Sequence, residues 1–257
     1  SICYLMRRLV VSDFHLDPSE PTHYRAAMDA LGQCGCDQLI LAGDIFEAWV
    51  GDDGATDDDR QFLEFCGGHS DDTLFIHGNR DFLIHENYLN QFDIRLVDRY
   101  IEDELIIIHG DELCTLDHAY QTYKQEVRQP SWINEFLAKP LSERQAIANK
   151  LRQASRETQA NRAEAIGDAV DSEINRWMSD YKAKLLVHGH THRPALHQTK
   201  EGLRAVTSDW AGSGIGVFID TTDSEQIVSL AHLSTNGPTM TEQWSRQAGT
   251  PEWKRNS

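Results

Sequence analysis

The chain has 257 residues, of which 40% are hydrophobic and 25% are charged, and these values exclude collagen, a coiled coil and a wholly disordered protein. Its 24 basic and 41 acidic residues give a net charge of −17, which argues against nucleic acid as a partner because duplex binding relies on clustered Lys and Arg. No apolar stretch approaches the ~20 residues needed to cross a bilayer, and no N-terminal run is typical of a signal peptide. We therefore expect a globular cytoplasmic protein whose five cysteines are free thiols.

Short apolar runs alternate with helical patterns along much of the chain. Helices are predicted at 24–31 and 60–66. Buried strands are predicted at 9–12, 38–42, 73–77, 105–109 and 184–188. This alternation of strands and helices is typical of an α/β sheet.

Each of the five predicted strands ends at a polar residue that can bind a metal ion. These residues are Asp13, Asp44, Asn79, His109 and His190. Sites in open α/β sheets form at the carboxyl ends of the strands. We therefore expect the five side chains to gather at one edge of the structure.

The sheet pattern stops between the fourth and fifth predicted strands. Residues 115–181 follow a helical pattern, broken at Pro130 and Pro140, and we expect them to form a cap over the polar cluster. Four short strands after His192 are expected to form a second sheet that closes a sandwich, at 195–199, 203–207, 216–220 and 226–231. We expect a core in two pieces, at 6–114 and 182–233. Residues 115–181 are expected to form a helical insertion, and residues 234–257 a mobile polar tail.

The spacing of the polar residues favours a site for two metal ions. Asp13 and His15 stand two residues apart, which places both side chains on one face of extended backbone. His190 and His192 repeat this spacing after the last of the five strands. Two Asp, one Asn and four His mix oxygen and nitrogen donors, which favours Mn, Fe or Zn over Mg or Ca. Seven ligands are too many for one tetrahedral ion and suit a pair of ions that share Asp44.

These motifs resemble those of the calcineurin-like metallophosphoesterases, which implies a four-layer α/β/β/α sandwich with a dinuclear metal centre. Arg80 stands where most members have His. In this respect the sequence resembles one branch of the family, which hydrolyses UDP-2,3-diacylglucosamine in lipid A biosynthesis. The longer segments that resemble this branch are 43–53, 75–83, 109–117 and 188–194. The motifs that carry the family resemblance are Asp13-x-His15, Gly43-Asp44, Gly78-Asn79-Arg80-Asp81, His109 and Gly189-His190-Thr191-His192.

The resemblance implies two Mn²⁺ ions per chain. The first ion would be bound by Asp13, His15, Asp44 and His192, and the second by Asp44, Asn79, His109 and His190. The catalytic residues would be Asn79, Arg80 and His190. The substrate would contact Asn79, Arg80, Asp117, Ser155, Gln159, Arg162 and His190. Gln159 and Arg162 depart from the branch, in which we expect Asn or Thr at the first position and Lys at the second.

The branch implies hydrolysis of the pyrophosphate bond of UDP-2,3-diacylglucosamine to 2,3-diacylglucosamine 1-phosphate and UMP. Such an enzyme would work on the cytoplasmic face of the inner membrane as a peripheral protein, and residues 132–162 would form an apolar slot for the acyl chains. One alternative is a phosphoesterase of the same fold that acts on a soluble nucleotide or phosphodiester; an apolar slot speaks against it. Another is a non-catalytic binding scaffold, which the presence of all seven ligands disfavours. Acyl-chain length and oligomeric state stay open at this point.

Overall fold

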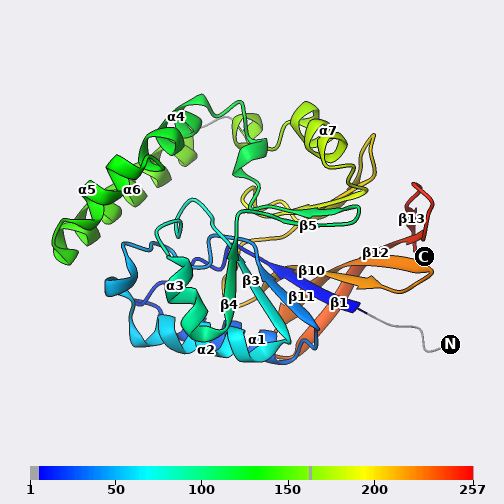
Figure 1. The fold of residues 1–257 in the computed structure, drawn as a ribbon, viewed down its shortest axis with the longest axis horizontal. Helices are drawn as coiled ribbons and strands as arrows, with labels where there is room; N and C mark the ends of the chain where they lie inside the picture. Colours follow the sequence, from blue (N-terminus) through cyan, green and yellow to red (C-terminus); the bar gives the residue numbers. More distant parts are fainter. Residues whose placement is uncertain (1–5, 162–163, 257) are drawn as a thin grey trace.

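The computed structural model describes residues 6–161 and 164–256, in which two β-sheets stack face to face between layers of helices (Figure 1). The strand order is β13-β12-β11-β10-β1-β2-β3-β4 in the first sheet and β5-β6-β7-β9-β8 in the second. The first sheet contains β1 (Met6–Val11), β2 (Gln38–Leu41), β3 (Asp72–Ile76), β4 (Ile94–Val97), β10 (Gly214–Thr221), β11 (Glu225–Ser234), β12 (Gly237–Gln247) and β13 (Lys254–Arg255). The second contains β5 (Tyr100–Glu102), β6 (Leu105–Ile107), β7 (Leu185–His188), β8 (Ala195–Gln198) and β9 (Leu203–Val206).

Helices cover both outer faces of the two sheets. In Figure 1, α1 and α2 lie under the first sheet, α7 lies over the second, and α4 to α6 extend beyond the edge of the sandwich. The α-helices are α1 (Pro21–Gly32), α2 (Asp57–His69), α3 (Glu86–Leu89), α4 (His118–Val127), α5 (Pro130–Leu137), α6 (Leu141–Asn161) and α7 (Asp171–Asp180). Short 3₁₀ turns are η1 (Asp52–Gly54), η2 (Asn90–Phe92), η3 (Asp111–Leu113) and η4 (Glu164–Gly167).

The parallel strands β1, β2 and β3 are buried on both faces, as their unbroken apolar runs predict. Leu9 pairs with Leu39, and both belong to the cluster that α1 and α2 cover. The next pair, Val10 and Ile40, belongs to the cluster between the two sheets. Successive side chains of a strand point to opposite faces, so each strand contributes to two layers of the core.

The outer face of the second sheet is covered by α7. Ile106 of β6 and Leu186 of β7 pack with Ile174 and Met178 of this helix. The chain therefore has four layers in the order helix, sheet, sheet, helix. This confirms the predicted α/β/β/α sandwich.

The structure places some strands in a different sheet from the one that the sequence predicted. The strands β8 and β9 lie in the second sheet as expected, whereas β10 and β11 join the first, where Phe218 of β10 lies opposite Leu9. The strands β6 and β7 belong to the second sheet, so the five polar strand ends come from two sheets. An apolar run indicates that a strand is buried but carries no information about which strand it pairs with.

The expectation of a mobile tail at 234–257 is also wrong. The strand β12 pairs with β11 over its whole length, and β13 pairs with β12. Trp253 is 4% exposed, and its Nε1 donates to the carbonyl oxygen of Lys184 at 2.8 Å. Most of β12 is half-buried or exposed, so its sequence is polar and lacks the apolar pattern of an inner strand.

The helices of residues 115–181 pack in two different places. Phe136 of α5 is buried in the first core cluster, and Trp132 and Ile147 pack against it. The helix α7 instead packs on the second sheet, as part of the sandwich. We use the word cap for α4, α5 and α6. Within the described ranges, no helix has the length and apolar character of a membrane span.

Candidate metal centre

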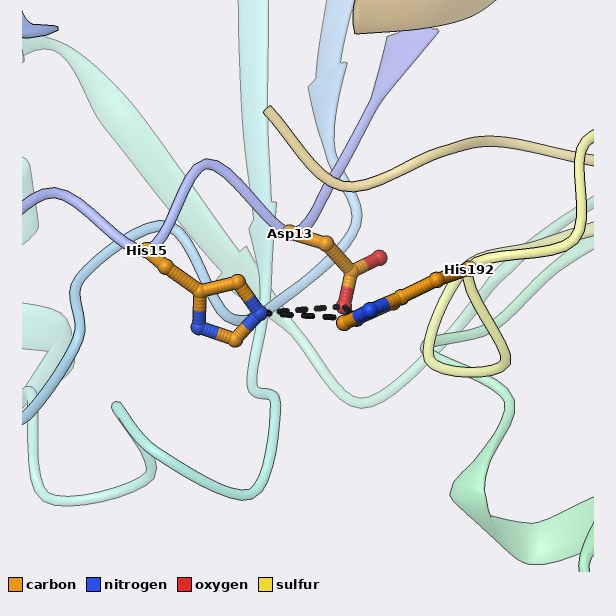
Figure 2. Close-up of side chains that lie close together, drawn as sticks. All are labelled: Asp13, His15 and His192. Carbon is orange, nitrogen blue, oxygen red and sulfur yellow. Dashed lines mark hydrogen bonds and ion pairs between the residues drawn. The ribbon is translucent and has the colours of Figure 1, made fainter. Parts of the chain in front are cut away.

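The first group of candidate ligands comprises Asp13, His15 and His192, which follow β1 and β7 (Figure 2). Nε2 of His192 lies 3.2 Å from Oδ1 of Asp13 and 3.5 Å from Nε2 of His15. The three ligand atoms lie within 4.8 Å of one another. Two imidazole nitrogens that face one carboxylate oxygen are donors of the type that Mn, Fe and Zn accept, so this group fits a divalent cation.

The second group comprises Asp44, His109 and His190, which follow β2, β6 and β7. Their ligand atoms also lie within 4.8 Å of one another. Oδ1 of Asn79 lies 3.1 Å from Nε2 of His109 and 3.1 Å from Nδ1 of His190, so the amide oxygen belongs to the same group. The structure thus brings the seven predicted ligands into two clusters, and their donor set fits a pair of divalent cations.

The backbone at these clusters is held in an uncommon conformation. Non-glycine residues with positive φ are rare and cost about 1–3 kcal/mol each, and such strain gathers at functional sites. Among residues 6–161 and 164–256, eight non-glycine residues have positive φ, and five of them are expected ligands. These five are Asp13 (φ 54°), His15 (φ 48°), Asp44 (φ 53°), His190 (φ 65°) and His192 (φ 56°).

Two glycines let the loops approach the carboxylates closely. A Cβ at Gly78 would clash with the carboxylate of Asp44, and a Cβ at Gly189 would clash with that of Asp13. Both glycines stand directly before an expected ligand, Asn79 or His190. Glycine is therefore required at these positions for steric reasons.

Asp81 joins the loops that follow β2 and β3. Its carboxylate accepts from the backbone N–H of Ile45 at 2.7 Å and from that of Gly78 at 2.8 Å. Burial and the nearby carboxylate of Asp44 raise the pKa of Asp81 to about 6. The residue thus fixes the positions of Asp44 and Asn79, which stand beside its two donors.

The electrostatics of the buried groups favour positive charge in the site. Burial opposes ionisation of Asp13, but its hydrogen bond with His192 and the charge of His109 lower the pKa of the carboxyl below its usual range. Burial lowers the pKa of His109, but the carboxylates of Asp44 and Asp13 outweigh it and raise the value to about 9. Burial and the neighbouring His109 lower the pKa of His190 to about 4. A cation would meet the same attraction that holds a proton on His109.

A cavity of about 670 Å³ lies between the cap and the metal-binding clusters. Its polar end is lined by Asn79, Arg80, His190 and His192. Apolar side chains of the cap and of the loop after β3 also line it, among them Phe82, Trp132, Phe136, Ala148 and Leu151, interspersed with polar ones such as Arg152 and Ser155. The cavity therefore joins a polar, cation-binding end to an apolar wall.

The predicted substrate residues fall into two sets. Asp117 and Ser155 line the cavity together with Asn79, Arg80 and His190. Gln159 lies in α6, but its side chain is outside the described part, and Arg162 lies outside the described residues altogether.

Three further residues of the cavity were not predicted from the sequence. Glu47 and Arg152 lie 3.6 Å apart, and Glu47 also contacts His15. The ring of Tyr120 lies 5.8 Å from that of His190, and its hydroxyl donates to Asp111 at 2.5 Å. None of the three stands beside the end of a predicted strand, so the pattern that identified the ligands did not extend to them.

Comparison with known proteins agrees with the fold. The model of the family described as "Calcineurin-like phosphoesterase" matches residues 6–194 of the chain. The chain belongs to this family.

Curated relatives are similar to this chain over most of their length. The chain is 37% identical over 219 residues to "UDP-2,3-diacylglucosamine hydrolase" of Chromohalobacter salexigens, which covers 80% of this chain and 89% of the relative. It is 36% identical over 237 residues to the protein of the same name from Stenotrophomonas maltophilia, with 84% and 95% covered. A solved structure of Vacuolar Protein Sorting 29 from Cryptosporidium parvum is 10% identical, covers 95% of this chain and 99% of its own, and has a TM-score of 0.50, a likeness of fold alone.

Proposed function

We propose that this chain hydrolyses the pyrophosphate bond of UDP-2,3-diacylglucosamine and releases 2,3-diacylglucosamine 1-phosphate and UMP. The relatives that share 36–37% of its residues over most of their length carry the name of this hydrolase. The metallophosphoesterase fold supplies a site for such a reaction.

The cavity is the observation that supports this substrate best. A UDP-linked diacylglucosamine has a charged pyrophosphate at one end and two apolar chains at the other. The cavity has Arg80, Asn79 and His190 at one end and an apolar wall that includes Phe136 and Leu151 along the cap. Burial of acyl chains on that wall would contribute ~0.8 kcal/mol per CH₂, less the cost of ordering the chains.

The side chains at the polar end have distinct roles in the proposed reaction. Two divalent cations held by the seven ligands would act as Lewis acids on the phosphate and lower the pKa of water. The water oxygen forms a bond to one phosphorus, the bond from that phosphorus to the bridging oxygen breaks, and the bridging oxygen leaves with the other phosphate. The protons of the water pass to the products or to solvent. The guanidinium of Arg80 would donate to the phosphate and stabilise the negative charge that develops there. The amide of Asn79 and the imidazole of His190 orient the phosphate beside it.

We further propose that the two cations are Mn²⁺ and that the protein works at the cytoplasmic face of the inner membrane, where its glycolipid substrate resides. The mixture of carboxylate, amide and imidazole donors supports Mn²⁺ over Mg²⁺ or Ca²⁺, which prefer oxygen ligands alone.

The test is an assay of the purified protein with Mn²⁺ on UDP-2,3-diacylglucosamine and on a simple phosphodiester. We expect UMP and the lipid 1-phosphate as products, and a much higher kcat/KM for the glycolipid. Equal kcat/KM values for the two substrates would contradict the proposed specificity. Absence of any turnover in the metal-loaded, folded protein would contradict the enzymatic function itself.

A further inference from the structure

Glu47 lies where the metal-binding clusters, the phosphate-binding arginine and the cap meet. It follows β2 by a few residues, and its side chain is 10% exposed in the wall of the cavity. Its two carboxylate oxygens point to different partners. Oε2 lies 3.1 Å from Nδ1 of His15, and Oε1 lies 3.4 Å from Arg80 and 3.6 Å from Arg152 of α6.

The contact with His15 determines which nitrogen of this imidazole can bind a cation. The carboxylate oxygen 3.1 Å from Nδ1 favours the tautomer with its proton on Nδ1, although the pair lacks the alignment of a hydrogen bond. Nε2, left without a proton in that tautomer, is the atom that faces His192 and Asp13 in Figure 2. Nδ1 of His109 instead contacts a backbone oxygen, that of Ala42, at 2.9 Å. The orientation of His15 therefore depends on a side chain, which a substitution can remove.

The strained backbone of His15 makes the orientation of its ring more dependent on the surrounding contacts. Its φ of 48° lies in the left-handed region, which a histidine adopts only when surrounding contacts enforce it. The backbone N–H of His15 donates to the carbonyl oxygen of Asp44 at 3.1 Å, which fixes the main chain. Glu47 provides a second contact, to the ring itself.

Two arginines hold the other oxygen of the Glu47 carboxylate. Oε1 lies 3.4 Å from Arg80 and 3.6 Å from Arg152. Arg152 is in turn paired with Asp17 at 3.0 Å. The carboxylate is thus anchored from the core and from the cap while its second oxygen contacts His15.

We propose that Glu47 is a positioning residue, which orients His15 for cation binding and is itself kept in place by Arg80 of the core and Arg152 of the cap. The inference rests on the proposed metal centre and adds a residue to it. Loss of a group that orients a metal-binding histidine typically weakens metal affinity about 10–100-fold.

The experiment is a Mn²⁺ titration by calorimetry of the wild type and of the variants Glu47→Ala, Glu47→Gln and Asp17→Asn, each checked for folding by thermal unfolding. Glu47→Ala should weaken Mn²⁺ binding about 10–100-fold. Glu47→Gln keeps an oxygen that accepts from His15, so its affinity should lie closer to that of the wild type. Asp17→Asn, the matched control, alters only the charge that pairs with Arg152 and should bind Mn²⁺ as the wild type does.

A second readout separates positioning from a general structural role. If Glu47 acts through His15, the Mn²⁺ concentration that half-activates Glu47→Ala should rise by the same factor as the dissociation constant, and saturating Mn²⁺ should restore most of the rate. Wild-type Mn²⁺ affinity in Glu47→Ala overturns the inference, and so does an equal loss of affinity in Asp17→Asn. Should Glu47→Ala not fold, wild-type Mn²⁺ affinity in a folded Glu47→Leu variant, which also lacks the acceptor, overturns the inference. The titration needs no glycolipid, so failure of the proposed substrate is a separate result.

Discussion

The backbone N–H of His190 donates to Oδ2 of Asp13 at 3.0 Å, so a loop of the second sheet is bonded to a carboxylate that follows the first strand of the first sheet. Ser12 and Thr207 form a second link between the sheets, with 2.6 Å between their hydroxyl oxygens. The backbone N–H of Trp210 also donates to the carbonyl oxygen of Asp13, at 3.1 Å. These bonds place the two clusters of candidate ligands side by side. The clusters can therefore form only when the two sheets are stacked.

Asp44 is expected to contribute to both cations, and Asp44→Asn should therefore cause a large loss of metal. The amide keeps an oxygen for the backbone N–H of Arg80, which lies 2.9 Å from Oδ1 in the wild type, so the loop should stay in place. Loss of the negative charge removes the attraction on which cation binding depends. We expect two Mn²⁺ per chain in the wild type, one or none in the variant, and almost no turnover.

Elemental analysis after dialysis gives the metal content, and circular dichroism gives the fold. A folded Asp44→Asn protein with two ions per chain and most of its activity would exclude Asp44 from the metal centre.

Arg80→Ala should lower kcat by ~10²–10³-fold, the scale of one lost contact in a transition state. The guanidinium of Arg80 lines the cavity and not a core cluster, so its removal should leave the fold intact. Arg80→Lys keeps the positive charge without the planar fork of donors and should give an intermediate rate. Steady-state kinetics of the three proteins at saturating Mn²⁺ make the comparison; a wild-type kcat in Arg80→Ala would remove this residue from the mechanism.

The clustering of the candidate ligands could be predicted because five of them follow short, largely apolar strands. That pattern is local, and Asp13, Asp44 and His109 are adjacent to such strands in the sequence. The membership of the sheets could not be predicted, because buried strands such as β6 and β10 carry the same apolar pattern whichever sheet they join.

Glu47 illustrates why part of the candidate site could not be predicted from the sequence. Its partners His15, Arg80 and Arg152 come from the loop after β1, the loop after β3 and the cap, and only the folded chain brings them together. In the sequence, Glu47 lies in segment 43–53, which resembles the branch, but its spacing from the predicted strand does not distinguish it from its neighbours. The polar strand β12 was missed for a similar reason, because its pairing with β11 is visible only in three dimensions.

Arg144 should contribute to stability and to the position of the cap. It is 3% exposed, and its guanidinium donates to the carbonyl oxygens of Lys139 at 3.0 Å and Val50 at 2.5 Å and pairs with Asp53. Arg144→Met leaves these carbonyl groups without their donor, at a cost of about 1–3 kcal/mol in the free energy of unfolding. The effect should be measurable by urea denaturation.

Asp53→Ala is the matched control for Arg144→Met. The Asp53 side chain is 64% exposed, so water can replace its partner, and the bonds from Arg144 to the two carbonyl oxygens persist. We expect a smaller loss of stability in this variant. An equal loss in both variants would show that the ion pair, and not the carbonyl bonds, determines the effect.

The apolar wall of the cavity should determine the preference for a diacyl substrate. Phe136 and Leu137 are poor sites for a test, because Phe136 is buried in the first core cluster and Leu137 packs against it. Leu151 of α6 lines the cavity and is 39% exposed, so Leu151→Asp should fold. Each CH₂ of an acyl chain that leaves the wall costs ~0.8 kcal/mol, about fourfold in KM.

Met240→Asp is the control for Leu151→Asp, since Met240 is 46% exposed on β12 and does not line the cavity. We expect Leu151→Asp to raise KM for UDP-2,3-diacylglucosamine at least fourfold per displaced CH₂, while hydrolysis of a small phosphodiester stays unchanged because the ligands and Arg80 are intact. Met240→Asp should change neither activity. If both activities fall together in Leu151→Asp, the cap acts on the metal centre itself. If neither falls, the acyl chains bind elsewhere, and a soluble substrate becomes the better explanation of the cavity.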